Sequence, residues 1–154
     1  MQYADVTVGE VEEFGQYEVT ESEVIEFAEQ YDPQPFHVDP EAAAESPYGG
    51  LIASGWHTCA MTMRMLVDHQ FGEEGTLGSP GVDELRWENP VRPGDVLSVR
   101  QEVTGKRPLN SDPSRGIVHT DLETVDQDGE TKLTWESNVF VVREPSEDET
   151  AEEA

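Results

Sequence analysis

The chain has 154 residues, a length typical of a single domain, and carries 34 Asp and Glu against 9 Lys and Arg, for a formal net charge of −25. Such a field repels nucleic acid and anionic lipid, because binding to either requires cationic side chains. High net charge can also indicate disorder, but the acidic residues are interspersed with ordered apolar patterns, so we expect a folded domain.

The composition and the cysteine content indicate the cellular setting. A carboxylate-rich surface with little lysine resembles that of haloarchaeal proteins, in which salt screens the self-repulsion of the surface. The single cysteine, Cys59, excludes an internal disulfide and agrees with a reducing cytosol. The sequence shows neither a signal-peptide pattern nor an apolar run long enough for a membrane helix. We therefore predict a cytoplasmic protein.

Helices are predicted in the first half of the chain. A capping box at Thr20 and Glu23 predicts a helix that ends near Tyr31, before two prolines. A second, short helix should begin at Asp39, because a proline follows at the first helical position. A third helix is predicted from about Gly55 to Val67. It is apolar around most of its circumference, so we expect it to be buried.

Strands are predicted in the second half. Alternating side chains indicate strands at residues 82–87, 96–103, 116–125 and 131–143. The last two form a hairpin through Asp128-Gly129, and residues 106–115 are expected to be a polar loop. A further strand could lie at 17–19. Helices followed by antiparallel strands predict an α+β fold, with a curved antiparallel sheet wrapped around one long central helix. Residues 1–143 would form this single domain, and the acidic residues 144–154 a disordered tail.

Asp32 and His37 form a candidate acid/base pair on a loop that Pro33 and Pro35 stiffen. Adding water to a double bond conjugated to a carbonyl requires one group to deprotonate water and another to protonate the α-carbon. Histidine, with a reference pKa of about 6.5, suits this chemistry near neutral pH, and a neighbouring carboxylate can fix its tautomer. An Asp and a His at this spacing also occur as a turn residue and a surface histidine, so the pair alone does not establish an active site.

Backbone amides could stabilise the anionic oxygen of such a reaction. Gly49-Gly50 and then Ser54-Gly55 precede the third predicted helix. The amides at a helix N-terminus favour negative charge.

Motifs of a known family occur in three stretches: Asp32–His37 (DPQPFH), Tyr48–Gly55 (YGGLIASG) and Asn89–Asp95 (NPVRPGD). Together they closely resemble the MaoC-like dehydratases, also called (R)-specific enoyl-CoA hydratases. The resemblance covers about residues 14–142. It implies a hot-dog fold and a homodimer, or a dimer-based higher oligomer, in which two sheets join and the active sites lie near the interface.

The resemblance also implies roles for particular residues. Asp32 and His37 match the family pair that holds the catalytic water, and Gly55 matches the oxyanion glycine. Two positions depart from the family motif: Gln34 replaces the usual Asn, and Ser54 replaces a frequent His. The longer amide at position 34 leaves the loop geometry and the substrate fit open.

Further candidates for substrate binding are Gln34, Ser54, Trp56, Lys106, Arg107 and Arg115. The last three form a local positive spot that could bind the phosphates of coenzyme A, or could simply offset neighbouring carboxylates. Trp56 and the methionines of the third helix could line an acyl tunnel or pack in the core. Trp87 and Trp135 are expected in the core. No metal or cofactor is expected, because the remaining histidines lack ligand-spaced partners.

The predicted activity is the reversible syn hydration of a trans-2-enoyl-CoA to an (R)-3-hydroxyacyl-CoA. Two alternatives remain open at this point. Hot-dog proteins include acyl-CoA thioesterases, and the change at Gln34 leaves room for a non-catalytic acyl-CoA-binding subunit.

The acidic composition leads to a prediction about salt. Stability should fall as KCl is lowered from molar to millimolar concentration, because the carboxylates then repel one another without screening. Thermal melts across this range measure the effect. A melting temperature that does not fall would contradict a salt-adapted surface.

Overall fold

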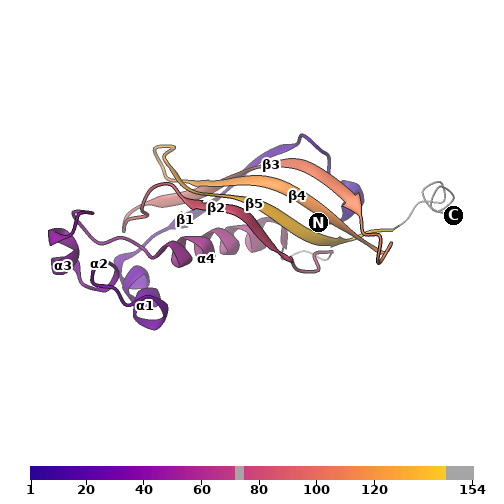
Figure 1. The fold of residues 1–154 in the computed structure, drawn as a ribbon. Coiled ribbons are helices and arrows are strands. Elements are labelled where there is room, and N and C mark those ends of the chain that lie inside the picture. Colours follow the sequence, from indigo (N-terminus) through magenta and orange to yellow (C-terminus); the bar gives the residue numbers. More distant parts are fainter. Residues whose placement is uncertain (72–74, 145–154) are drawn as a thin grey trace.

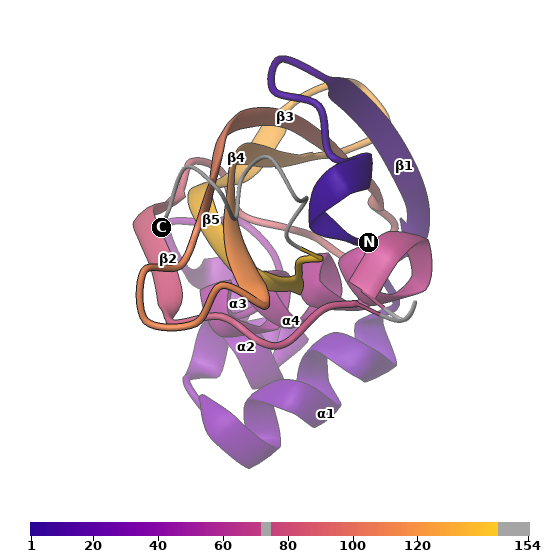
Figure 2. The same cartoon turned by 90° about the vertical axis from the view of Figure 1, so that its right-hand side faces the viewer.

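The computed structural model describes residues 1–71 and 75–144, and in them a curved antiparallel sheet encloses one long helix (Figure 1). The sheet order is β1-β3-β4-β5-β2. The strands are β1 (Val11–Glu18), β2 (Gly81–Trp87), β3 (Val96–Pro108), β4 (Arg115–Val125) and β5 (Thr131–Val142). The helix α4 (Gly55–Leu66) lies on the inner side of the sheet (Figure 2) and continues into the π-helical turn η2 (Val67–Phe71). This arrangement confirms the predicted α+β hot-dog fold.

Three shorter helices gather at one end of the sheet, beside the start of α4 (Figure 1): α1 (Glu21–Tyr31), α2 (Pro35–Val38) and α3 (Pro40–Glu45). The predicted start of α1 is confirmed, since Thr20 Oγ1 accepts a hydrogen bond from the amide of Glu23 at 3.3 Å. The Asp39 carboxylate caps α3 in the same way. Helix α2 was not predicted. Its first residue is Pro35, so a proline expected only to stiffen a loop begins a new helical turn.

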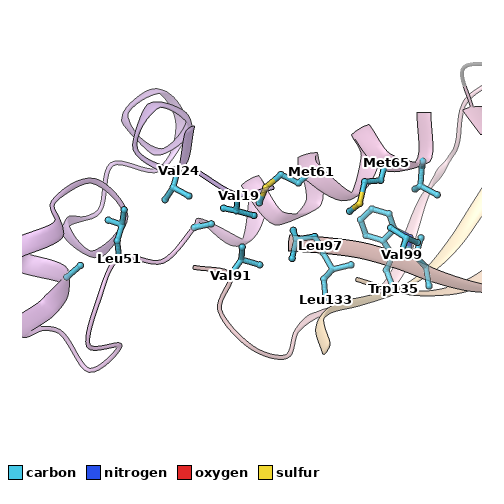
Figure 3. Packing of buried hydrophobic residues seen from close by; sticks show 14 residues of the cluster. Val19, Val24, Leu51, Met61, Met65, Val91, Leu97, Val99, Leu133 and Trp135 are labelled. Carbon is cyan, nitrogen blue, oxygen red and sulfur yellow. The ribbon is translucent and has the colours of Figure 1, made fainter. Parts of the chain in front are cut away.

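The core lies between α4 and the sheet (Figure 3). Met61 and Met65 of α4 are buried against side chains such as Leu97, Leu133 and Trp135 from the strands. Core packing is therefore the role of these two methionines. Helix α4 is not buried on every side, however, and this expectation was wrong for one face. The exposed apolar side chains of that face are Trp56, Met63 and Val67.

Two expectations about the strands also need correction. Strand β3 extends to Pro108, which pairs with Gly116, so residues 106–108 and 115 of the predicted polar loop at 106–115 belong to the sheet. Side chains in this stretch are polar because it forms an exposed strand end. Trp87 was expected in the core but is 46% exposed, because β2 is an edge strand with a single neighbour. Residues 145–154 of the predicted tail at 144–154 lie outside the described residues.

The buried Lys132 anchors the segment that joins β2 to β3. Its Nζ donates to the carbonyl of Pro90 at 3.1 Å and to the carboxylate of Glu130 at 2.6 Å, and lies 3.4 Å from Asp126 and 3.7 Å from Asp95. Burial disfavours the ammonium, but these carboxylates outweigh it and raise the pKa of Lys132. The charged side chain thus fixes residues 88–95 to the β4–β5 hairpin.

Neither a membrane-spanning helix nor a metal-binding cluster is found in the described part of the chain. Within residues 1–71 and 75–144, none of the helices combines the length and apolarity that a bilayer-spanning segment needs. The described His, Cys, Asp and Glu side chains do not form a group of three or more that could hold a metal ion.

Candidate active site

A short buried segment, Leu51–Ser54, connects the elements that form the site. It is neither helix nor strand, yet its residues are at most 8% exposed. Buried backbone of this kind needs hydrogen-bond partners. The amide of Ile52 donates to the carbonyl of Phe36 at 3.1 Å, and the amide of Ala53 donates to the carbonyl of Val91 at 2.8 Å. The segment therefore ties α2 on one side to the β2–β3 connection on the other.

Asp32 and His37 face each other beside this segment. Asp32 is the C-cap of α1, and His37, on α2, is 5% exposed. The Nδ1 atom of His37 lies 2.7 Å from the carbonyl oxygen of Ile52. Because a carbonyl oxygen only accepts, Nδ1 carries a proton; Nε2 is then an acceptor when the ring is neutral and a donor when the ring is protonated. This Nε2 lies 3.3 Å from Asp32 Oδ2. With the ring neutral, two proton acceptors converge on a space where one water molecule could donate to both; with the ring protonated, Nε2 faces the carboxylate as a cation.

Hydrogen bonds keep Asp32 ionised. Gln34 Nε2 donates to its Oδ1 at 2.7 Å, and Ser54 Oγ donates to its Oδ2 at 2.8 Å. Desolvation by burial works against the charge, but these two donors and the neighbouring His37 outweigh it and lower the pKa of Asp32 from its ordinary value. A lowered pKa in the folded state means that the ionised carboxylate stabilises the fold above its ordinary pKa. This stabilisation is lost as the pH falls through the lowered value.

Gly55 offers an open backbone amide at the N-terminus of α4. Ser54 caps the helix by accepting from the amide of Trp56 at 3.3 Å. Within the described residues, the amide of Gly55 has no hydrogen-bond partner. A Cβ at this position would overlap the indole ring of Trp87, so only glycine fits between that ring and the helix backbone. The open amide at the positive end of the helix could bind an anionic oxygen.

These groups share one cavity of about 440 Å³. It brings together six of the predicted site residues: Asp32, Gln34, His37, Ser54, Gly55 and Trp56. Sequence reasoning did not assign the rest of its lining, which consists of Phe36, Tyr48, Ile52, Ala53, Thr58 and the run from Trp87 to Val91. In the sequence, only the motif at Asn89–Asp95 pointed to that run. The first three residues of the motif, 89–91, form part of the cavity wall.

The three predicted phosphate-binding cations do not line this cavity. In the backbone register of β3 and β4, Lys106 lies opposite Val118 and Arg107 opposite Ile117. This is the end of the β3–β4 pairing that lies away from Ser98, whereas the cavity wall comes just before the start of β3. Lys106 Nζ donates to the carbonyl of Tyr3 at 3.0 Å, and Arg115 Nε lies 3.0 Å from Asp112. Contact between these cations and coenzyme A therefore remains a prediction.

Comparison with known proteins identifies the family. The sequence profile of the MaoC like domain matches residues 5–125. The chain belongs to the MaoC-like family. It is 41% identical to a MaoC-like dehydratase from Rhodospirillum rubrum, whose crystal structure superposes with a TM-score of 0.83 over 95% of this chain and 99% of that one.

Two further similarities span most of this MaoC-like chain. The 3-hydroxyacyl-thioester dehydratase Z of Mycobacterium tuberculosis is 31% identical over 128 residues, which cover 78% of this chain and 83% of the relative. The structure of the R-hydratase PhaJ1 from Pseudomonas aeruginosa is 26% identical, with a TM-score of 0.71, and the match covers 93% of this chain and 86% of that one.

The two positions at which this MaoC-like chain departs from the motif have a common function in its structure. Among residues 1–71 and 75–144, Gln34 and Ser54 are the two side chains that donate hydrogen bonds to Asp32. The longer amide of Gln34 reaches back to the carboxylate, and the hydroxyl of Ser54 reaches it from the start of α4. The departures therefore preserve an ionised Asp32 beside His37.

Removing one of these donors should change the titration of Asp32. In Ser54→Ala the pKa of Asp32 should rise, because a hydrogen bond to the charged form is lost while the burial of the carboxyl remains. Carboxyl ¹³C NMR, with Asp32→Asn used to assign the signal, follows this titration. Ser54→Thr keeps the hydroxyl and should titrate like the parent protein. An unchanged pKa in Ser54→Ala would contradict the stabilising role of the hydroxyl.

Proposed function

We propose that the protein catalyses the reversible hydration of a trans-2-enoyl-CoA to an (R)-3-hydroxyacyl-CoA in a salt-rich cytoplasm. The observation that carries this proposal is the 3.3 Å approach of His37 Nε2 to Asp32 Oδ2 in a cavity that also holds the open amide of Gly55. The names of the relatives support it, because dehydratase Z acts on 3-hydroxyacyl thioesters and PhaJ1 is an R-hydratase.

The proposed mechanism uses Asp32 and His37 as one unit. The two side chains hold a water molecule, and one of them takes a proton from it as the water oxygen bonds to the β-carbon of the enoyl group. Negative charge moves to the thioester oxygen, where the amide of Gly55 and the N-terminus of α4 stabilise it. The pair then returns a proton to the α-carbon. Both new bonds form on the same face of the double bond, since the single Asp32–His37 pair both delivers the water and returns the proton.

The alternative functions differ in their products. A thioesterase would direct the water to the thioester carbonyl and release a free thiol. A non-catalytic acyl-CoA-binding subunit would release nothing and would leave the enoyl absorbance unchanged. Gln34 suggested a non-catalytic subunit because it departs from the family motif. Its side chain donates a hydrogen bond to the Asp32 carboxylate, however, and this contact favours an enzyme. Purified protein with crotonyl-CoA in molar KCl, followed for both enoyl absorbance and free thiol, separates the three functions.

Loss of the carboxylate should abolish most of the activity. Asp32→Asn should lower kcat/KM for crotonyl-CoA by about 10³-fold or more, because the amide cannot accept a proton from water. Its fold should be retained, and circular dichroism checks this. Val8→Ala, which alters an exposed side chain outside the cavity, serves as the control with parent activity. Near-full activity of Asp32→Asn would refute the assignment.

We further propose that the active form is a homodimer or a dimer-based higher oligomer. Exposed apolar side chains lie on α4, η2 and the edge strand β2, and the rings of Trp56 on α4 and Trp87 on β2 are in contact, with centroids 5.1 Å apart. The exposed apolar side chains of these elements are Trp56, Met63, Val67, Val82 and Trp87. A water-exposed face of this kind is unusual in so acidic a chain. The occupant we propose is a second copy, whose β2 would extend the sheet and whose α4 would cover the apolar side chains.

A charge placed on this face should separate the subunits. Met63→Glu should halve the particle mass measured by light scattering in molar KCl, because it places carboxylates of both copies in an apolar interface. Val8→Glu adds the same charge at an exposed position outside the face and should leave the mass unchanged. A parent protein that is monomeric, or a mass that Met63→Glu does not reduce, would refute this interface.

A further inference from the structure

Arg92 lies directly beside the proposed catalytic cavity. Its neighbour Val91 lines the cavity, and so does Tyr48. The guanidinium Nη2 donates to the carbonyl of Tyr48 at 2.7 Å, which holds the side chain against the loop at this edge of the cavity. One of the few cations in the chain is thus fixed next to the cavity by a hydrogen bond that leaves most of its donors for other groups.

The guanidinium of Arg92 has no carboxylate partner within the described residues. Lys106 and Arg107 have none either in this part of the chain, but they lie away from the cavity, toward the far end of β3. Carboxylates do pair with Arg64, Arg86, Arg100, Arg115 and Lys132. Asp95 lies near, but its carboxylate accepts from the backbone amide of Arg92 and faces Lys132. The positive charge at this edge of the cavity is therefore not neutralised by the protein.

The neighbouring loop leaves the guanidinium accessible. A Cβ on Gly50 would stand 3.4 Å from Arg92 Nη1, so the glycine leaves that side of the arginine uncovered. Gly49 has a φ of +69°, and a Cβ there would meet no atom within 4 Å, which marks open space at the loop. An anion can approach the planar guanidinium here and accept two parallel hydrogen bonds.

We propose that Arg92 binds a phosphate of the coenzyme A that carries the acyl group, an inference that rests on the proposed function. With the thioester at Gly55, the pantetheine arm must leave the cavity past its edge, and its phosphates then meet a protein surface of net charge −25. Salt screens the distant carboxylates, and a cation in direct contact with the phosphate supplies the attraction at short range. Arg92 provides this cation beside the cavity, whereas Lys106 and Arg107 lie toward the far end of β3.

The test compares substrates with and without phosphate. In molar KCl, Arg92→Ala should raise KM for crotonyl-CoA about tenfold, the loss expected for a charge-assisted hydrogen bond. The KM for crotonyl-pantetheine, which has no phosphate, should stay at the parent value. Arg92→Lys keeps the charge and should recover part of the affinity for crotonyl-CoA. Arg64→Ala removes a cation that is already paired with Asp68 and should change neither KM.

Each outcome decides the proposal. Equal effects of Arg92→Ala on both substrates would show that the arginine only supports the loop, and no effect on either would remove it from the binding site. If Arg107→Ala raises KM for crotonyl-CoA selectively and Arg92→Ala does not, the phosphate lies at the far end of β3 and the inference fails. Parent activity on crotonyl-pantetheine tests the hydration separately, so failure of the proposed function remains distinguishable.

Two further substrates identify the phosphate that Arg92 binds. Crotonyl-dephospho-CoA lacks the 3′-phosphate, so a selective effect that persists with this substrate assigns Arg92 to the pyrophosphate. A crotonyl group on an acyl carrier protein presents a single phosphodiester. A selective effect of Arg92→Ala with that substrate, but not with crotonyl-CoA, would overturn coenzyme A as the carrier.

Discussion

The site depends on how the buried segment Leu51–Ser54 satisfies its backbone. Lacking regular structure of its own, it takes its hydrogen bonds from Phe36 on one side and Val91 on the other. Its carbonyl at Ile52 fixes the protonated nitrogen of His37. The segment ends at the cap of α4, where Ser54 meets Asp32. One chain of hydrogen bonds thus sets the imidazole tautomer, the position of the carboxylate and the start of the helix, since buried polar groups left without partners would each be costly.

Opposing forces act on Asp32, and their balance determines its charge. Burial alone would favour the neutral acid, whereas two side-chain donors and the charge of His37 when it is protonated favour the ion. Neither donor is the residue that the family motif leads one to expect. The physical requirement is a hydrogen-bond donor within reach of each carboxylate oxygen, and Gln34 and Ser54 meet it with different side chains. The hydrogen bonds to Asp32 are therefore present although positions 34 and 54 carry residues that differ from the family motif.

The scarcity of cations makes their placement informative. Exposed pairs such as Arg64–Asp68 contribute little, because water and salt screen them. Lys132 differs because it is buried among carboxylates and holds the wall of the cavity through Pro90. Arg92 differs because it stands beside that wall without a carboxylate. In a protein whose net charge repels anions, both residues place a positive charge at the site. Lys132 holds the cavity wall in position, and Arg92 would bind the phosphate of the proposed ligand.

The sequence by itself determined the helix starts at Thr20 and Asp39, the central helix, the hairpin at Asp128-Gly129 and the candidate pair Asp32 and His37, because capping, helical periodicity, turn chemistry and short motifs act over a few residues. Only the tertiary structure decided which nitrogen of His37 faces Asp32, that Trp87 covers Gly55, and that Arg92 lies beside the cavity whereas Arg107 does not line it. These facts depend on contacts between residues distant in the chain, and such contacts cannot be predicted from the local pattern of side chains.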